Sequence, residues 1–228
     1  MRMRKKKNGE QRLAAAAHLL CTDAETVKSD PQGPFGGSSA ALHLEIGCGK
    51  GKFSVEMAAS RKNIHFYAVE RMTDVMICAV ERALKNEADC ADNLRFIISD
   101  ASALTEWFPP HIFDCIYLNF SDPWPKSGYY KRRLTYRRFL EIYKTLLKPD
   151  GILRLKTDNE NLFSFSLEEF EAAGMPLQKI SRDLHHSEYA SDNIMTEYEM
   201  MFSSRGMPVY FAEVSAAGTS RSDGAPEN

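Results

Sequence analysis

The stretch ALHLEIGCGKG, residues 41–51, decides the fold of this 228-residue chain. Its first six residues are typical of a buried strand, and they lead directly into a glycine turn that can open a helix. Glycine in such a turn permits positive φ angles and lets the backbone approach a ligand closely. The stretch therefore predicts a parallel α/β sheet with a ligand at the carboxyl end of this strand.

The spacing of the glycines separates two classes of ligand. A dinucleotide-binding turn reads G-x-G-x-x-G and places a pyrophosphate at the helix N-terminus. This chain reads G-x-G-x-G from Gly47 to Gly51, and the carboxylate of Glu45 stands directly before the turn. Because that carboxylate would repel a pyrophosphate and attract a cationic amine, an NAD-dependent oxidoreductase ranks last.

Strands and helices alternate along the chain, which predicts βαβ units with right-handed crossovers. We expect strands at 41–46, 64–69, 94–98, 113–118 and 151–156, and helices near 51–60, 72–88, 101–108, 134–147 and 160–173. After a strand-like segment at 177–180, the segments 197–202 and 209–214 flank a Gly206–Pro208 break and predict a closing antiparallel hairpin. The predicted fold is a Rossmann-like α/β domain with a mainly parallel, seven-stranded sheet and helices on both faces.

Three parts are expected along the sequence: a basic N-terminal arm and linker at 1–40, one domain at 41–214 and a disordered tail at 215–228. Five of the first seven residues are Arg or Lys. We therefore expect residues 1–12 to be mobile until an anionic partner orders them. Thr73 is expected to cap the second helix of the domain.

Three acidic residues end consecutive predicted strands. Glu70 ends the second strand. In nucleotide-binding folds an acidic residue roughly 20 residues or more after the glycine turn binds ribose hydroxyls, and Glu70 matches this spacing. Asp100 can accept a hydrogen bond from an exocyclic amine such as that of adenine. Each acid alone is more often a solvated loop residue, but together they describe a pocket for an adenosine without phosphates. S-adenosylmethionine fits that description.

A second motif, NFSDPWPK at residues 119–126, follows an apolar run and is expected at the carboxyl end of another strand. Its two prolines each fix φ near about −65° and remove an N–H group, so they end the strand and stiffen the loop. Asp122, Trp124 and Lys126 place a carboxylate, an aromatic ring and a cation in a segment that can hold a planar base. A Pro-rich turn with a packed Trp is the alternative interpretation.

The composition, 43% hydrophobic and 26% charged, is ordinary for one large globular α/β domain. The net charge of −2 does not by itself indicate a nucleic-acid partner, but basic residues cluster at the start and between positions 126 and 138. Five scattered cysteines without a C-x-x-C pair predict reduced thiols, a cytoplasmic location and no metal. No segment approaches the roughly 18 apolar residues of a transmembrane helix, so no membrane partner is expected.

These motifs resemble those of the bacterial tRNA (guanine-N7)-methyltransferases over essentially residues 41–214. The segments that carry the resemblance are LEIGCGKG at 44–51, YLNFSDPWPK at 117–126, KRRLT at 131–135, FL at 139–140, KTDN at 156–159, LF at 162–163 and IMTEYE at 194–199. The resemblance implies a class I methyltransferase fold, S-adenosyl-L-methionine as cofactor and tRNA as partner. The implied reaction is methylation of N7 of guanosine 46 in the variable loop, by a monomer or a homodimer.

The resemblance also implies roles for individual residues. Cofactor binding is assigned to Glu45, Glu70, Asp100 and Asp122, beside Gly47 and Gly49 of the turn. Substrate binding is assigned to Lys126, Asp158, Thr196, Glu197, Tyr198 and Glu199, and the candidate catalytic residues are Asp122 and Asp158. The loop that contacts RNA is Gly128, Tyr129, Tyr130, Lys131, Arg132 and Arg133. Because the family often has Arg-His in this loop, where tyrosines stand here, stacking on RNA is an alternative to phosphate contact.

The implied chemistry agrees with the residues. Guanine N7 carries an in-plane lone pair, so direct transfer of a methyl group from a sulfonium needs no general base. The burden falls on alignment, which can supply roughly 7–11 kcal/mol for well-placed reactants. Since N1–H and the N2 amine of guanine are donors, we expect Asp158 to read that edge, with Glu197 and Glu199 as further candidates. Lys126 is expected to contact O6 or a phosphate, with a solvent-facing lysine as the alternative.

Two other functions remain open at this point. Asp-Pro-Trp resembles the Asp-Pro-Pro-aromatic motif of amino-methylating enzymes, which stack a flipped base, so an adenine-N6 methyltransferase of the same fold is one alternative. A non-catalytic RNA-binding relative is the other, although the intact acids and glycines speak against it. The basic run after Lys126 favours RNA over a small-molecule substrate.

Overall fold

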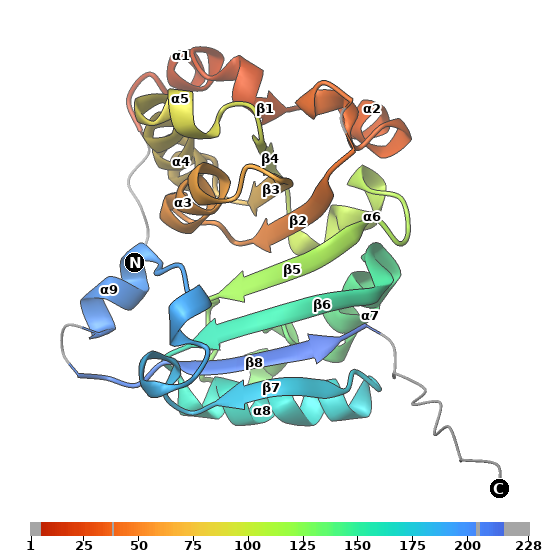
Figure 1. Ribbon diagram of the computed structural model, residues 1–228, viewed down its shortest axis with the longest axis vertical. Coiled ribbons are helices and arrows are strands. Elements are labelled where there is room, and N and C mark those ends of the chain that lie inside the picture. Colours follow the sequence, from red (N-terminus) through yellow and green to blue (C-terminus); the bar gives the residue numbers. More distant parts are fainter. Residues whose placement is uncertain (1–5, 38, 204–205, 217–228) are drawn as a thin grey trace, which may run out of the picture.

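Eight strands form one sheet in the computed structural model, which describes residues 6–37, 39–203 and 206–216 (Figure 1). The strands are β1 Leu20–Cys21, β2 Ala41–Ile46, β3 Ile64–Glu70, β4 Leu94–Ile98, β5 Phe113–Asn119, β6 Leu147–Thr157, β7 Leu177–Ser181 and β8 Tyr210–Ser215. Their order is β1-β4-β3-β2-β5-β6-β8-β7. Strands β1 to β6 pair in parallel, and β8 runs antiparallel between β6 and β7. The chain order reverses between β2 and β5, which is where open α/β sheets bind ligands.

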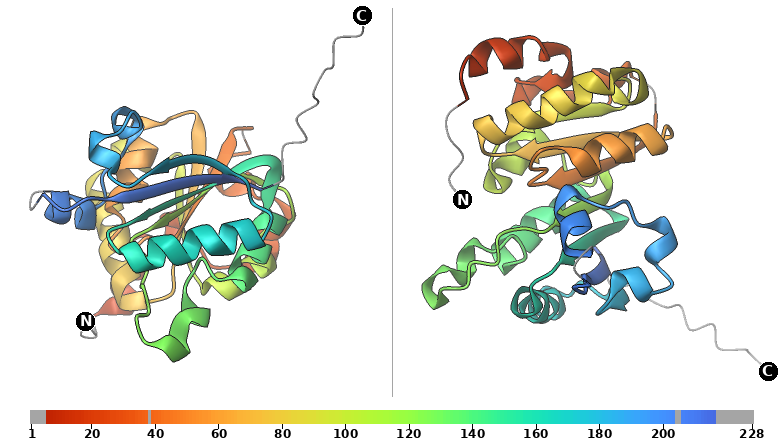
Figure 2. Two further views of the ribbon diagram at one scale, coloured as in Figure 1. Left: turned by 90° about the horizontal axis from the view of Figure 1, so that it is seen from below. Right: turned by 90° about the vertical axis from the view of Figure 1, so that its left-hand side faces the viewer.

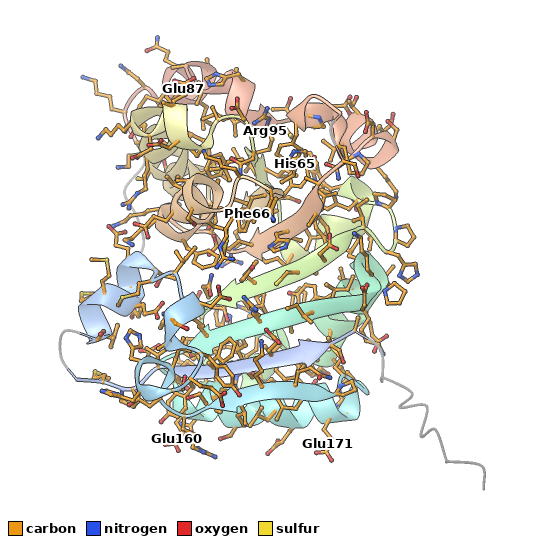
Figure 3. All side chains as sticks on the ribbon, viewed as in Figure 1. His65, Phe66, Glu87, Arg95, Glu160 and Glu171 are labelled. Carbon is orange, nitrogen blue, oxygen red and sulfur yellow. The ribbon has the colours of Figure 1, made fainter. Side chains whose placement is uncertain are left out.

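Helices cover both faces of the sheet (Figure 2). The α-helices are α1 Gly9–Ala14, α2 Ala24–Ser29, α3 Lys52–Ser60, α4 Thr73–Lys85, α5 Glu87–Cys90, α6 Leu104–Trp107, α7 Arg137–Leu146, α8 Glu160–Ala172 and α9 Glu197–Ser203. Apolar side chains of α3 and α4 pack on one face, and those of α6, α7 and α8 pack on the other. Phe66 of β3 lies inside the first of these cores, whereas Glu160 and Glu171 at the two ends of α8 point outward (Figure 3).

The described N-terminal residues belong to the packed domain, in contrast to the separate arm and linker that we expected. Arg12 of α1 donates two hydrogen bonds, of 2.5 and 2.7 Å, to the carboxylate of Glu81 on α4. Ala16 and Leu19 are fully buried, and β1 adds an eighth strand beside β4. The alanine-rich stretch folds here because it buries apolar surface that α4 and β4 would otherwise expose. Residues 1–5 of the expected mobile arm lie outside the described residues.

Two local predictions were wrong. Residues 197–202 form helix α9 and not a strand, so the antiparallel partner of β8 at the sheet edge is β7. Thr73 is the first residue of α4, and the N-cap position belongs to Met72, which makes no side-chain cap bond. The predicted tail at 215–228 lies outside the described residues apart from Ser215, which ends β8, and Ala216.

The described part of the chain contains no helix long and apolar enough to cross a membrane.

Candidate active site

A cavity of about 420 Å³ lies at the carboxyl ends of β2, β3, β4 and β5. Four residues that the sequence predicted for the cofactor, Gly47, Glu70, Asp100 and Asp122, line it. They come from four different strand ends, which the parallel sheet brings to one edge. The view in the right panel of Figure 2 looks onto this edge.

The glycine turn forms one wall of the cavity. Gly47 has a φ of 80°, and no atom lies within 4 Å of the position that a Cβ would take, so the space beside it is open to a ligand. The backbone N–H of Gly49 donates to Oε2 of Glu70 over 3.2 Å, and that of Met72 donates to Oε1 over 2.9 Å. The turn and the carboxylate of Glu70 therefore hold each other in place at the ends of neighbouring strands.

Two polar groups at the cavity, the carboxylate of Asp100 and the hydroxyl of Ser121, differ in their hydrogen bonding. The carboxylate of Asp100 accepts hydrogen bonds from the backbone N–H and the hydroxyl of Ser102, over 3.0 and 2.7 Å, and these bonds lower the pKa of Asp100. Asp100 is thus a preorganised anion at neutral pH. The hydroxyl of Ser121, by contrast, is buried and has no hydrogen-bond partner among the described residues. A buried polar atom of this kind indicates a ligand that supplies the missing bond.

Glu45 does not reach the cavity wall. Its side chain is 2% exposed, and its oxygens accept hydrogen bonds from the hydroxyl of Ser54 and, over 2.9 Å, from Nδ2 of Asn119. Burial raises the pKa of Glu45 to about 7, although both hydrogen bonds and the nearby charge of Lys156 favour the ionised form. The residue thereby joins β2, α3 and β5 beneath the glycine turn. Direct contact of Glu45 with the cofactor stays a prediction.

The end of β5 has an unusual backbone. Phe120 and Trp124 have φ angles of 50° and 43°, in the left-handed region that bulky side chains rarely adopt. Such conformations cost about 1–3 kcal/mol each and are concentrated at functional sites. Both residues line the cavity, together with Asp122 between them. The strain indicates that the loop is built to present these side chains.

The predicted RNA-contacting loop forms the 3₁₀ helix η4, Ser127–Arg132, which projects from the body of the domain (Figure 2, right). The guanidinium of Arg132 lies 5.1 Å from the ring centroid of Trp124 and 4.5 Å from that of Tyr129. Arg133 is used internally, because its Nε donates to the carbonyl of Pro123 over 2.8 Å. Lys126, Gly128, Tyr130 and Lys131 are exposed, and Lys126 lies outside the cavity lining.

The segment Thr196–Glu199 is a helix cap. The backbone N–H of Glu199 donates to the hydroxyl of Thr196 over 2.9 Å, and the N–H of Thr196 donates to Glu199 over 3.1 Å. This reciprocal pair is a capping box, which starts α9. The motif T-x-x-E was visible in the sequence, and it explains why a helix stands where we expected a strand.

Glu199 is fully buried, and protein donors already occupy its carboxylate. Lys156 binds it over 2.7 Å, Asn193 over 2.6 Å and His185 over 2.9 Å. Burial disfavours the charged form, but Lys156 and the hydrogen bonds more than offset this, so the pKa of Glu199 is lowered. A carboxylate bonded in this way is not free to read a base, which corrects the expectation for Glu199.

The remaining substrate candidates, Asp158, Glu197 and Tyr198, differ in their surroundings. Asp158 follows β6, is partly exposed and is outside the cavity lining. Glu197 is exposed and forms ion pairs of 3.2 Å with Arg82 and 3.7 Å with Lys50. The ring of Tyr198 is half exposed, and its centroid lies 5.6 Å from that of Phe120. Tyr198 is therefore the member of this group that adjoins the cavity.

Among the charged residues that line the cavity, sequence reasoning did not assign Arg71 and Arg138 to the site. Arg71 directly follows Glu70, and Arg138 ends the basic run that begins at Lys126. The available signal for Arg71 was its position directly after Glu70, which the sequence had already predicted for the site. For Arg138 no signal separates it from the rest of the run.

Comparison with known proteins gives consistent matches over most of the chain. A family model described as putative methyltransferase matches residues 39–212. A tRNA (guanine-N(7)-)-methyltransferase of Brevibacillus brevis is 50% identical over 179 residues, which are 78% of this chain and 82% of that protein. One of Lactococcus lactis subsp. cremoris is 41% identical over 214 residues, 93% of this chain and 97% of that protein.

Solved structures match in fold at much lower identity. An antibiotic-related methyltransferase has a TM-score of 0.63 and 16% identity, covering 86% of this chain and 95% of that chain. The 16S rRNA methyltransferase KamB has a TM-score of 0.61 and 13% identity, covering 84% of this chain and 95% of that chain. These likenesses establish the class I methyltransferase fold.

Proposed function

This chain belongs to the tRNA (guanine-N(7)-)-methyltransferase family, and we propose that it methylates N7 of a guanosine in tRNA, guanosine 46 of the variable loop, with S-adenosyl-L-methionine as donor. The observation that carries the proposal is the cavity lined by Gly47, Glu70, Asp100 and Asp122 in a chain so similar to these relatives. The adenine-N6 and non-catalytic alternatives rank below it, because they do not account for that similarity.

The residues at the cavity fit S-adenosylmethionine. Glu70 offers carboxylate oxygens to ribose hydroxyls, and Asp100 offers an acceptor to the adenine amine. Asp122 supplies negative charge for the amino group and the sulfonium, and the orphaned hydroxyl of Ser121 gains a partner. The open side of Gly47 admits the ligand against the backbone. When bound, the cofactor supplies an electrophilic methyl group.

The role of the chain is to bind and orient, since guanine N7 needs no proton removed. Asp122 stands between Phe120 and Trp124, whose positive φ angles set the course of the backbone on either side of it. A rigid loop of this kind lowers the cost of aligning two reactants. We assign no general base to the reaction.

Recognition of guanine is the role proposed for Asp158. Its side chain is partly exposed and forms no hydrogen bond with the described residues, so its two oxygens are available to the N1–H and N2 donors. Tyr198 is proposed to stack on a base, because its ring is half exposed beside Phe120. Thr196 supports this role by capping the start of α9. Glu197, which is exposed, is the further candidate for reading the guanine edge. Lys126 is the cation proposed for O6 or a phosphate.

The projecting loop is the proposed RNA contact. Tyr129 and Tyr130 are 41% and 39% exposed, which leaves ring faces for stacking on unpaired bases. Lys131 and Arg132 offer cations to phosphate, whereas Arg133 braces the loop through Pro123. RNA contact by Gly128 would be through its backbone.

The test is methyl transfer from labelled S-adenosylmethionine to bulk unmodified tRNA, followed by reduction and aniline cleavage, which cuts at 7-methylguanosine. We expect label in tRNA and a cut in the variable loop. Label without cleavage would indicate another target atom. Binding of tRNA and cofactor without label would indicate the non-catalytic alternative.

A further inference from the structure

Three arginines differ from the others in the described part of the chain. Eight of the eleven arginines there donate a hydrogen bond to a carboxylate or a carbonyl, namely Arg12, Arg61, Arg82, Arg95, Arg133, Arg137, Arg154 and Arg182. Arg71, Arg132 and Arg138 show no such bond and no ion pair with the described residues. All three line the cavity of the active site and are exposed, so they stand at its opening. We call them the rim arginines.

Arg132 is already held between two aromatic rings of the projecting loop, but Arg71 and Arg138 come from other elements. Arg71 lies between β3 and the start of α4, and Arg138 is the second residue of α7. Positive charge near a helix N-terminus is unfavourable unless an anion compensates it. At Arg137 the carboxylate of Glu169 does so over 3.1 Å, whereas Arg138 only lies over the ring of Phe139.

The carboxylate of Asp100 is not the missing partner. It accepts both of its hydrogen bonds from Ser102, and Arg71 and Arg138 act on it only through their nearby charge. The two guanidinium groups thus keep their planar donor sets free, and such donor sets match phosphate oxygens in a bidentate manner. The exposed guanidinium groups at the opening can therefore bind an anion that the described part of the chain does not supply.

We propose that Arg71 and Arg138 bind the phosphate backbone of the RNA substrate, which crosses the opening of the cofactor cavity from the projecting loop toward α4. This inference rests on the proposed function and extends the RNA surface beyond residues 128–133. A backbone held across the opening blocks the way out of the cavity. The cofactor consequently enters before the RNA, and its demethylated product leaves after it.

The test uses the double variant Arg71→Gln with Arg138→Gln in the full chain. A plot of the logarithm of the tRNA association constant against the logarithm of the salt concentration has a negative slope. Each lost phosphate contact makes this slope shallower by about 0.7–0.9, so the double variant should be shallower by about 1.4–1.8. At 0.1 M salt the same counterion release corresponds to tRNA binding that is about 25- to 60-fold weaker. The matched control is Lys28→Gln with Lys85→Gln, two exposed lysines outside the cavity, for which the slope should not change.

Two further measurements separate the outcomes. Calorimetry with S-adenosylmethionine alone should give unchanged affinity for the double variant. A loss of cofactor affinity with intact tRNA binding would mean that the arginines hold the cofactor carboxylate, and it would overturn the inference. Bound tRNA should slow the release of labelled S-adenosylhomocysteine from the wild type but not from the double variant.

An unchanged salt slope, or release of S-adenosylhomocysteine that tRNA does not slow, would also refute the RNA path. Failure of the proposed function is distinguishable from these results. In that case the wild type itself would produce no aniline-sensitive methylation of tRNA.

Discussion

Replacement of Glu45 by Gln tests whether ionisation of this buried carboxylate lowers the stability of the folded protein. The pKa of Glu45 is about 7 in the folded protein, against an ordinary value of 4.5. Below about pH 4.5 both states keep the proton, so Glu45 costs nothing. As the pH rises toward 7 the unfolded chain releases the proton first, and the folded state loses stability.

The size of this effect follows from the two pKa values. Between pH 5 and pH 8 the penalty of ionising Glu45 in the folded state grows by about 2.5 kcal/mol. Gln carries no charge, and the hydroxyl of Ser54 can turn to accept from the new amide. The free energy of unfolding of Glu45→Gln, minus that of the wild type, should therefore rise by about 2.5 kcal/mol from pH 5 to pH 8.

The assay is urea unfolding of both proteins across this pH range. The difference between their free energies of unfolding at each pH removes the contribution of all other titrating groups. Glu56→Gln is the matched control, because Glu56 lies on α3, is exposed and pairs with Lys52 at the surface. Its difference from the wild type should stay flat. If the Glu45→Gln curve runs parallel to the wild type, the carboxylate ionises freely, and Lys156 stabilises it more than burial opposes it.

Three further substitutions test the site and its support. Glu70→Gln should weaken S-adenosylmethionine by about 1.5–3 kcal/mol in calorimetry, because one charged acceptor for a ribose hydroxyl is lost, with tRNA affinity almost unchanged; unaltered cofactor binding would remove Glu70 from the cofactor site. Asp158→Asn should slow single-turnover methylation about ten- to more than a hundredfold, since an amide turns a donor toward guanine, while tRNA binding holds within a few-fold; a wild-type rate would pass the role to Glu197. Glu199→Gln should lower the free energy of unfolding by about 3–5 kcal/mol, because Lys156 is left buried without its partner. The control Glu197→Gln, at an exposed neighbour, should lower it by at most about 1 kcal/mol. Equal losses would mean that the buried pair does not stabilise the fold.

The core of the sheet was predictable because its pattern is local. Strands 41–46 and 94–98 were predicted with their observed bounds, since apolar runs bounded by turn residues leave little choice. The glycine turn and the acids at the strand ends were predictable for the same reason. Parallel strands bring their carboxyl ends together whatever the details of packing.

The segment 194–203 shows where such reasoning fails. Polar and apolar residues alternate around Tyr198, which is a strand pattern, yet Thr196 and Glu199 also form a capping box. The helix prevails because Glu199 reaches the ammonium of Lys156, 43 positions earlier in the chain. That contact depends on the folded position of β6. The same limit applies to the rim arginines, because whether an arginine lacks a partner is decided by distant residues.

The arrangement of acids and arginines around one cavity explains how a chain of net charge −2 can serve a cationic cofactor and a polyanionic substrate at one opening. Acidic side chains occupy the wall and the base of the site, where Glu70 and Asp100 are fixed by backbone donors and Glu45 is buried below. The rim arginines line the same cavity and are exposed. Interactions between exposed charges are screened beyond about 8 Å in physiological salt, so each ligand is affected mainly by the charged side chains that it contacts. The charges of Arg71 and Arg138 also help to lower the pKa of Asp100. Removal of rim charge should therefore weaken the binding of RNA and leave the affinity for the cofactor unchanged, because Ser102 is the main stabiliser of the Asp100 carboxylate.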